Sequence, residues 1–158
     1  SEFGLTRQLG FSREESRSYI ARYFQRYPGV LDYMERTRQI AREQGFVETI
    51  LGRRLYTPDI LASNKMIKQA AERAAINAPL QGSAADIIKL AMIAVDKVLP
   101  KDQAKLLLQV HDELVFEADA AIADELSKQI AKVMQSVLEI SVPFVVEVGQ
   151  GQNWDAAH

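Results

Sequence analysis

The sequence predicts an α+β fold in which helices pack on one face of an antiparallel sheet. Two observations support this class. Apolar residues recur at helical spacing over long stretches, and shorter apolar runs rich in Leu, Val and Phe flank polar turns. The expected helices lie at about 12–27, 28–44, 64–98 and 120–138, the hairpins at about 46–56 and 106–117, and a final strand, opened by Pro143, at 144–148.

The first two helices have identifiable ends. Ser12 and Glu15 form a capping-box pattern, in which the hydroxyl accepts the Glu15 amide and the carboxylate reaches back. Pro28 suits the first turn of the second helix because its missing N–H would be unpaired there anyway. Gly45 is a natural C-terminal stop. The apolar face expected for the second helix consists of Val30, Leu31, Met34 and Ala41.

Aromatic residues follow the first helix at helical spacing. The stripe consists of Tyr19, Ile20, Tyr23, Phe24 and Tyr27. Such a stripe could stack bases, but large apolar side chains are more often buried, so we expect it to face the core.

The long helix has two distinct halves. Five alanines make the first half slim, which favours helix and permits close approach: Ala70, Ala71, Ala74, Ala75 and Ala78. Pro79 removes a backbone donor and should kink or divide the helix. The core face of the second half should be Ile87, Ile88, Ala91, Met92 and Val95, and that of the last helix Ala123, Leu126, Ile130, Val133, Met134 and Val137.

The hairpin at 106–117 has an unusual tip. Tight hairpin turns favour Asn-Gly, Asp-Gly or Gly-X because their central residues take positive φ, yet this tip reads His111-Asp112-Glu113 and has no glycine. A local rule broken without local gain is where function is expected. The alternative is a solvated acidic turn without function.

Composition fits one compact domain or two small subdomains. The 158 residues are 47% hydrophobic and include no cysteine, which suits a reducing compartment. No apolar run approaches the ~20 residues that span a bilayer, and no secretory signal is evident. Residues 1–78 carry 13 Lys and Arg against 9 Asp and Glu, whereas residues 79–158 carry 6 against 12. The basic N-terminal half suits binding to the phosphates of a nucleic-acid backbone. The acidic C-terminal half, which carries the hairpin at 106–117, suits binding of magnesium by carboxylate oxygens.

Polar residues form a second stripe on the long helix. Arg73, Asn77 and Gln81 stand at i, i+4 and i+8, so they would share one face before the kink. All three can donate hydrogen bonds to the minor-groove acceptors that every Watson–Crick pair presents. The alternative is an ordinary solvated helix face.

Several motifs together resemble the family A DNA polymerases. The hairpin at 106–117 is similar to the motif C of that family, and residues 1–5 resemble the segment after its nucleotide-binding helix. The other motifs are GRRLYTPDI at 52–60, ERAAINAP at 72–79 with QGSAADIIK at 81–89, and VEVG at 146–149 with NWDAAH at 153–158. They follow in family order over nearly the whole chain, which therefore looks like the C-terminal portion of a longer bacterial enzyme.

The resemblance implies template-directed nucleotidyl transfer to a primer 3′-hydroxyl in DNA replication and repair. It assigns Asp112 and Glu113 as catalytic, with Asp112 holding Mg²⁺ in a two-metal mechanism. His111 would lie near the primer terminus. The DNA-binding residues that it implies are Ser1, Phe3, Arg73, Asn77, Gln81 and His111.

The same resemblance implies an organisation and a set of partners. Residues 1–67 would belong to the fingers and residues 68–158 to the palm. Partners would be primer–template DNA, deoxynucleoside triphosphates and the N-terminal part of the same polymerase, in the bacterial cytoplasm at the nucleoid and without a membrane.

Several parts of the family's catalytic machinery have no counterpart in the sequence. These are the second metal-binding aspartate of motif A, the cationic fingers helix and the thumb. We therefore expect the chain alone to lack polymerase activity. The alternatives are a standalone DNA-binding module and a catalytically silent structural domain.

Overall fold

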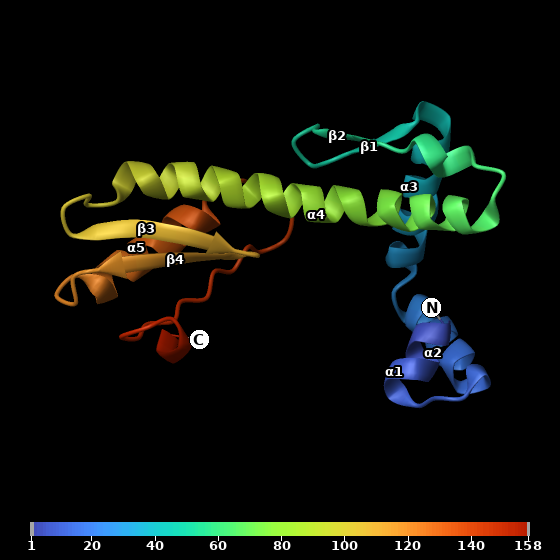
Figure 1. Cartoon of the computed structure of the whole chain (residues 1–158), viewed down its shortest axis with the longest axis horizontal. Coiled ribbons are helices and arrows are strands. Elements are labelled where there is room, and N and C mark those ends of the chain that lie inside the picture. Colours follow the sequence, from blue (N-terminus) through green and yellow to red (C-terminus); the bar gives the residue numbers. More distant parts are fainter. Residues whose placement is uncertain (1, 158) are drawn as a thin grey trace. The chain divides into compact units, whose positions relative to one another are not determined.

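The computed structural model describes residues 2–157 and divides into two compact units (Figure 1). Unit 1 runs to Glu48 and again from Gly52 to Pro79, and unit 2 comprises Thr49–Leu51 and the chain from Leu80 onward. The elements are α1 (Glu2–Leu9), α2 (Arg13–Arg26), α3 (Pro28–Gln44), β1 (Phe46–Glu48), β2 (Arg54–Tyr56), η1 (Pro58–Leu61), α4 (Lys65–Val98), β3 (Ala104–Val110), β4 (Glu113–Ala118), α5 (Ala123–Gln135) and η2 (Asp155–Ala157). The class is α+β, as expected.

Local signals define the helix ends of unit 1. Both capping-box hydrogen bonds are present, from the Glu15 amide to Ser12 Oγ at 3.2 Å and from the Ser12 amide to Glu15 Oε2 at 2.8 Å. Pro28 opens α3, and Gly45 caps it with a left-handed φ of 77°. The short helix α1 was not among the predicted elements.

The core of unit 1 is small. Its buried apolar residues come from α3, β1, η1 and α4: Ala41, Val47, Ile60 and Ala75. Strand β1 pairs antiparallel with β2, as the predicted hairpin requires. Of the expected apolar face of α3, Ala41 is fully buried, whereas Val30 and Leu31 remain 38% and 39% exposed.

The prediction that the aromatic stripe faces the core is wrong for its three tyrosines. Tyr19, Tyr23 and Tyr27 are 46%, 43% and 51% exposed, whereas Ile20 and Phe24 are half-buried. The physical reason is the packing of α2, whose one fully buried residue is the small Ser16. Its hydroxyl lies 3.1 Å from that of Thr6, so the helix packs through a polar contact.

Helix α4 continues through Pro79, so the alternative of a divided helix is wrong. Asn64 Oδ1 caps its start by accepting from the Met66 and Ile67 amides at 2.9 and 3.3 Å. An 18-residue window has a mean hydropathy of 1.2, so by length and composition α4 could cross a membrane. In unit 2, however, its residues Ala91 and Val95 are fully buried in the core.

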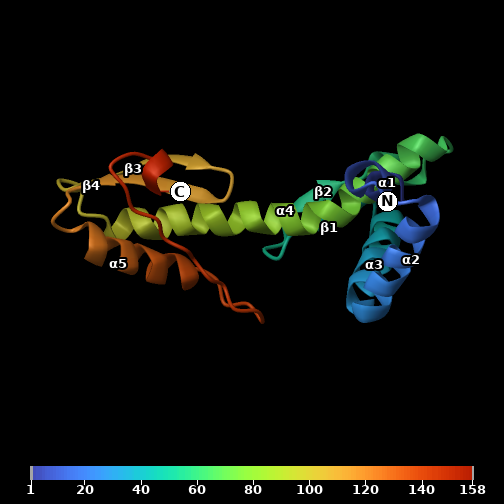
Figure 2. The same cartoon turned by 90° about the horizontal axis from the view of Figure 1, so that it is seen from below.

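In unit 2, the β3–β4 hairpin and α5 pack against the second half of α4, as the two views in Figure 1 and Figure 2 show. The buried core is Ala91, Val95, Leu99, Ala104, Leu126, Ile130 and Met134. Leu106, Leu114 and Phe116 of the hairpin pack against it. The predicted core faces of α5 and the second half of α4 are therefore largely confirmed.

The predicted final strand at 144–148 is wrong. These residues have no regular secondary structure, and Val145 is 72% exposed. A strand needs hydrogen-bonding neighbours, and each sheet within residues 2–157 contains only two strands. In the described chain, the segment at 144–148 is therefore paired with neither sheet, although its residues favour strands.

Candidate functional site

The tip of the β3–β4 hairpin is a two-residue turn. Val110 pairs with Glu113, so His111 and Asp112 alone form the loop, and Glu113 is the first residue of β4 instead of part of the turn as predicted. His111 has a φ of 53° and is the one non-glycine residue with positive φ in the described chain. A positive φ at only the first turn position matches the sign pattern of a type II′ turn, which normally has glycine there.

Gln109 stabilises this strained position. Its Nε2 donates a 2.9 Å hydrogen bond to the carbonyl oxygen of His111. A non-glycine residue in the left-handed region costs on the order of 1–3 kcal/mol and persists only when its surroundings fix it. The side chains of His111 and Asp112 are both exposed, and that of Glu113 is half-buried. The turn thus presents an imidazole and a carboxylate to solvent from a fixed backbone.

A bulge lies lower in the same hairpin. The pairing shifts by one residue between Leu106 and Leu108, which leaves Leu107 as the extra residue of β3. Leu114 and Phe116 pack on the core and pair with Gln109 and Leu106 respectively. Bulges redirect side chains near functional sites, and without this one Gln109 would not lie opposite Leu114.

Asp112 has the chemistry of one magnesium ligand. Mg²⁺ in nucleotide-handling sites is held by one or two carboxylates, with water and substrate phosphates completing the octahedron. An exposed carboxylate on a fixed turn fits that part, and the half-buried Glu113 is its neighbour. No group of three or more His, Cys, Asp or Glu within residues 2–157 could hold a metal ion by itself. The donor set fits a contribution to a magnesium site rather than a complete one.

The three polar residues of the predicted DNA-binding stripe all lie in α4 and are exposed. Arg73 and Asn77 belong to unit 1, and Gln81 belongs to unit 2. Of the three other predicted DNA contacts, His111 lies in the β3–β4 turn described above. Ser1 lies outside the described residues, as does the side chain of Phe3, whose backbone is in α1.

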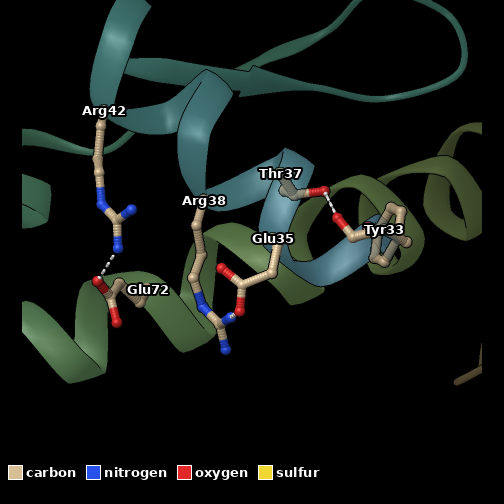
Figure 3. A network of polar contacts seen from close by, with 6 residues as sticks. All are labelled: Tyr33, Glu35, Thr37, Arg38, Arg42 and Glu72. Carbon is tan, nitrogen blue, oxygen red and sulfur yellow. Dashed lines mark hydrogen bonds and ion pairs between the residues drawn. The ribbon is translucent and has the colours of Figure 1, made fainter. Parts of the chain in front are cut away.

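Two polar contacts join α3 to the first half of α4 within unit 1. Arg42 Nη2 lies 2.6 Å from Oε1 of Glu72, and Glu72 is the residue directly before Arg73 in the sequence (Figure 3). The Tyr33 hydroxyl donates a 2.8 Å hydrogen bond to the carbonyl oxygen of Ile76, directly before Asn77. These contacts fix the backbone that carries Arg73 and Asn77.

The Arg42–Glu72 contact is a charge-assisted hydrogen bond that shifts the pKa of Glu72. The hydrogen bond from Arg42 holds the pKa of Glu72 below its ordinary value, and the nearby Arg38 and Lys68 act in the same direction. Arg38 itself pairs with Glu35 on α3, and Thr37 Oγ1 donates to the Tyr33 carbonyl at 2.7 Å (Figure 3). The folded chain therefore favours the ionised form of Glu72 more than the unfolded chain does.

Sequence reasoning missed the supporting residues Gln109, Tyr33 and Arg42. Gln109 stands two positions before His111, and such a spacing is a usable signal for a side chain that bonds to a turn. Tyr33 and Arg42 reach partners 43 and 30 residues away, so no local pattern could reveal their roles.

Comparison with known proteins gives a consistent result. The sequence profile of DNA polymerase family A matches residues 1–156. The chain is 54% identical over 160 residues to DNA polymerase I of Pseudomonas aeruginosa, covering all of this chain and 18% of that protein. It is 46% identical over 159 residues to DNA polymerase I of Mycobacterium tuberculosis strain H37Rv, covering 99% of this chain and 18% of that protein.

A solved structure is also similar. It is the POL domain of Pol1 from M. smegmatis, in complex with DNA primer-template and dNTP. The TM-score is 0.93 and the sequence identity 46%, covering 99% of this chain and 28% of that one. The chain thus spans less than a fifth of the length of the two curated relatives described above, and it aligns with each over nearly all of its own residues. With a family profile that matches almost from end to end, this chain belongs to DNA polymerase family A.

Proposed function

We propose that the chain provides the C-terminal catalytic hairpin and the minor-groove contacts of a DNA-directed DNA polymerase that acts in replication and repair. The observation that carries this proposal is the glycine-free turn, in which a fixed backbone presents His111 and Asp112 to solvent. The similarity to a polymerase domain solved with primer-template and dNTP supports these partners. Residues 1–67 would form part of the fingers and residues 68–158 part of the palm.

Asp112 is the residue that would hold Mg²⁺, and Glu113 is an auxiliary acid beside it. When bound in such enzymes, magnesium neutralises charge on the transferring phosphoryl group and activates the attacking oxygen. The contribution of this chain is positional, because paired strands hold a carboxylate more precisely than a mobile loop. His111, the neighbour of Asp112, would contact the primer terminus from the same hairpin turn.

Arg73, Asn77 and Gln81 would read the minor groove of the primer–template. Their donors suit the purine N3 and pyrimidine O2 acceptors that every Watson–Crick pair presents, so they check pair shape without preferring a sequence. The alanines between them keep the helix slim enough for close approach. Ser1 and Phe3 would add contacts to the DNA.

The chain spans 18% of the Pseudomonas relative, so in this proposal the remaining machinery would come from further polypeptide. The partner would be the N-terminal part of the same polymerase, and the place of action the bacterial cytoplasm at the nucleoid. Two-metal catalysis needs both ions fixed together, which a single carboxylate pair cannot achieve.

A chimera tests the proposal. The chain replaces the aligned C-terminal segment of Pseudomonas aeruginosa DNA polymerase I, to which it is 54% identical. Primer extension with magnesium and all four deoxynucleoside triphosphates is then measured for the chimera, for the truncated relative and for the chain alone. We expect extension by the chimera only. Extension by the chain alone, or an inactive but folded chimera, would contradict the proposal.

A further inference from the structure

Helix α2 carries a mixed aromatic and basic stripe that the site described above does not use. The α2 stripe consists of Tyr19, Arg22, Tyr23, Arg26 and the C-cap residue Tyr27. These positions stand at i, i+3, i+4, i+7 and i+8, so they share one helix face. All five side chains are exposed, the tyrosines by 43–51%.

The rings of the stripe lie close enough to act together. The Tyr23 and Tyr27 centroids are 5.1 Å apart at an interplanar angle of 49°, and the Arg26 guanidinium carbon lies 5.9 Å from the Tyr27 centroid. At the other end, Tyr19 and Phe11 have centroids 6.0 Å apart. They line an open hollow of about 420 Å³ together with Glu14, Glu15, Ser18 and Arg22.

The charged side chains that α2 itself carries along the stripe are all basic after Glu15. No acidic residue occurs between Glu15 and Asp32, whereas Arg17, Arg22 and Arg26 fall in that interval. Glu15 is engaged by Ser12 in the capping box, which also lowers its pKa. Glu14 and Glu15 lie at the start of the helix, so the acidic side chains of α2 itself are confined to that end.

We propose that the α2 stripe binds single-stranded nucleic acid. Tyrosine and arginine alternate along the face, as base and phosphate alternate along a strand, so rings can stack on bases while guanidinium groups contact phosphates. Unpaired bases have free faces, whereas those of a duplex are already stacked. An apolar protein partner fits less well, because it would bury Arg22 and Arg26 without acidic partners.

This inference rests on the proposed function in one respect: a template-directed polymerase meets unpaired template, which would be the strand bound here. The binding itself needs no polymerisation and no magnesium. A negative result for the stripe would therefore leave the chimera assay unaffected, and an inactive chimera would not remove binding by α2.

Fluorescence anisotropy with the purified chain tests the proposal, using a 5′-labelled oligonucleotide of about twelve thymidines and a blunt duplex hairpin as probes. One variant combines Tyr19→Leu, Tyr23→Leu and Tyr27→Leu, which keep apolar bulk and helix propensity but remove the rings. A second combines Arg22→Gln and Arg26→Gln.

The matched controls are Tyr56→Leu, an exposed tyrosine on β2, and Arg13→Gln, an exposed arginine on another face of α2. Circular dichroism checks that each variant retains its helix content.

We expect the chain to bind the single strand in preference to the duplex. The tyrosine variant should weaken binding by roughly tenfold or more, since base stacking on one aromatic ring alone contributes about fivefold or more. The arginine variant should reduce the slope of log affinity against log salt by about 1.4, which corresponds to two lost phosphate contacts. Both controls should bind within about twofold of the unaltered chain.

Three results would overturn the proposal. One is equal loss of affinity in a control and in its stripe variant. Another is unchanged single-strand affinity in both stripe variants. The third is self-association of the chain, seen by sedimentation, that the tyrosine variant abolishes while single-strand binding persists, because the stripe would then be an interface between copies.

Discussion

Gln109 Nε2 donates a 2.9 Å hydrogen bond to the carbonyl oxygen of His111, the described non-glycine residue whose φ is positive. The bond joins the last part of β3 to the turn that presents Asp112. It explains how a turn without glycine keeps a backbone conformation that residues other than glycine adopt in only a few per cent of cases. The strain at His111 and the position of Asp112 are thus consequences of the same local structure.

Replacing His111 by glycine should stabilise the chain. Glycine adopts positive φ without steric cost, so His111→Gly should raise the free energy of unfolding by about 1 kcal/mol after its own entropic cost is subtracted. Urea denaturation followed by circular dichroism measures the change. The matched control is Asp112→Gly, at a position without positive φ, which should destabilise the chain by about 0.5–1 kcal/mol. The same sign for both variants would refute the strain at His111.

Removing the Tyr33 hydroxyl should destabilise unit 1. Tyr33→Phe deletes the 2.8 Å hydrogen bond to the Ile76 carbonyl and should cost about 1 kcal/mol, the usual net value of one hydrogen bond. Tyr23→Phe, at an exposed ring on α2, should change the free energy of unfolding by no more than about 0.5 kcal/mol. Indistinguishable values for the two variants would show that the bond contributes nothing.

The Arg42–Glu72 pair should make stability depend on pH. Because the pKa of Glu72 is lowered from 4.5 in the folded chain, the pair stabilises above pH 4.5, and this contribution is lost as the pH falls through the lower, folded-state pKa. Glu72→Gln should therefore cost about 1 kcal/mol near neutral pH and progressively less in acid. Urea denaturation as a function of pH measures this, with the exposed Glu139→Gln as control. A cost for Glu72→Gln that persists undiminished in acid would argue against the ion pair.

Arg73 should sense base-pair shape. In the chimera with the Pseudomonas enzyme, Arg73→Ala should slow extension from matched and mismatched primer ends by different factors, since a minor-groove contact depends on pair geometry. Pre-steady-state extension rates on the two primers provide the comparison. Equal factors on both would instead indicate a simple phosphate contact.

The sequence predicted the elements whose signals are local. The Ser12–Glu15 box, Pro28 and Gly45 mark helix ends through contacts within a few residues, and the apolar periodicity of α5 reflects one buried face. The sequence also predicted the exposed turn at His111, because the two apolar runs within 106–117 and the polar, glycine-free tip between them are visible in the sequence itself.

What failed depended on partners distant in the chain. The tyrosines of α2 have the spacing of a core face, but α2 packs through Ser16 instead. The segment at 144–148 has strand propensity without an assigned strand to pair with. The bulge at Leu107 follows from pairing register, which composition does not reveal.

The most direct test of the catalytic assignment is the single-turnover rate of primer extension by the chimera carrying Asp112→Asn. The matched control is Asp119→Asn, an exposed carboxylate just after β4. If Asp112 holds the catalytic magnesium, its loss should slow the chemical step on the order of 10³-fold or more, whereas Asp119→Asn should leave the rate nearly unchanged. A rate for Asp112→Asn within about tenfold of the unaltered chimera would contradict the assignment of this hairpin as the catalytic one.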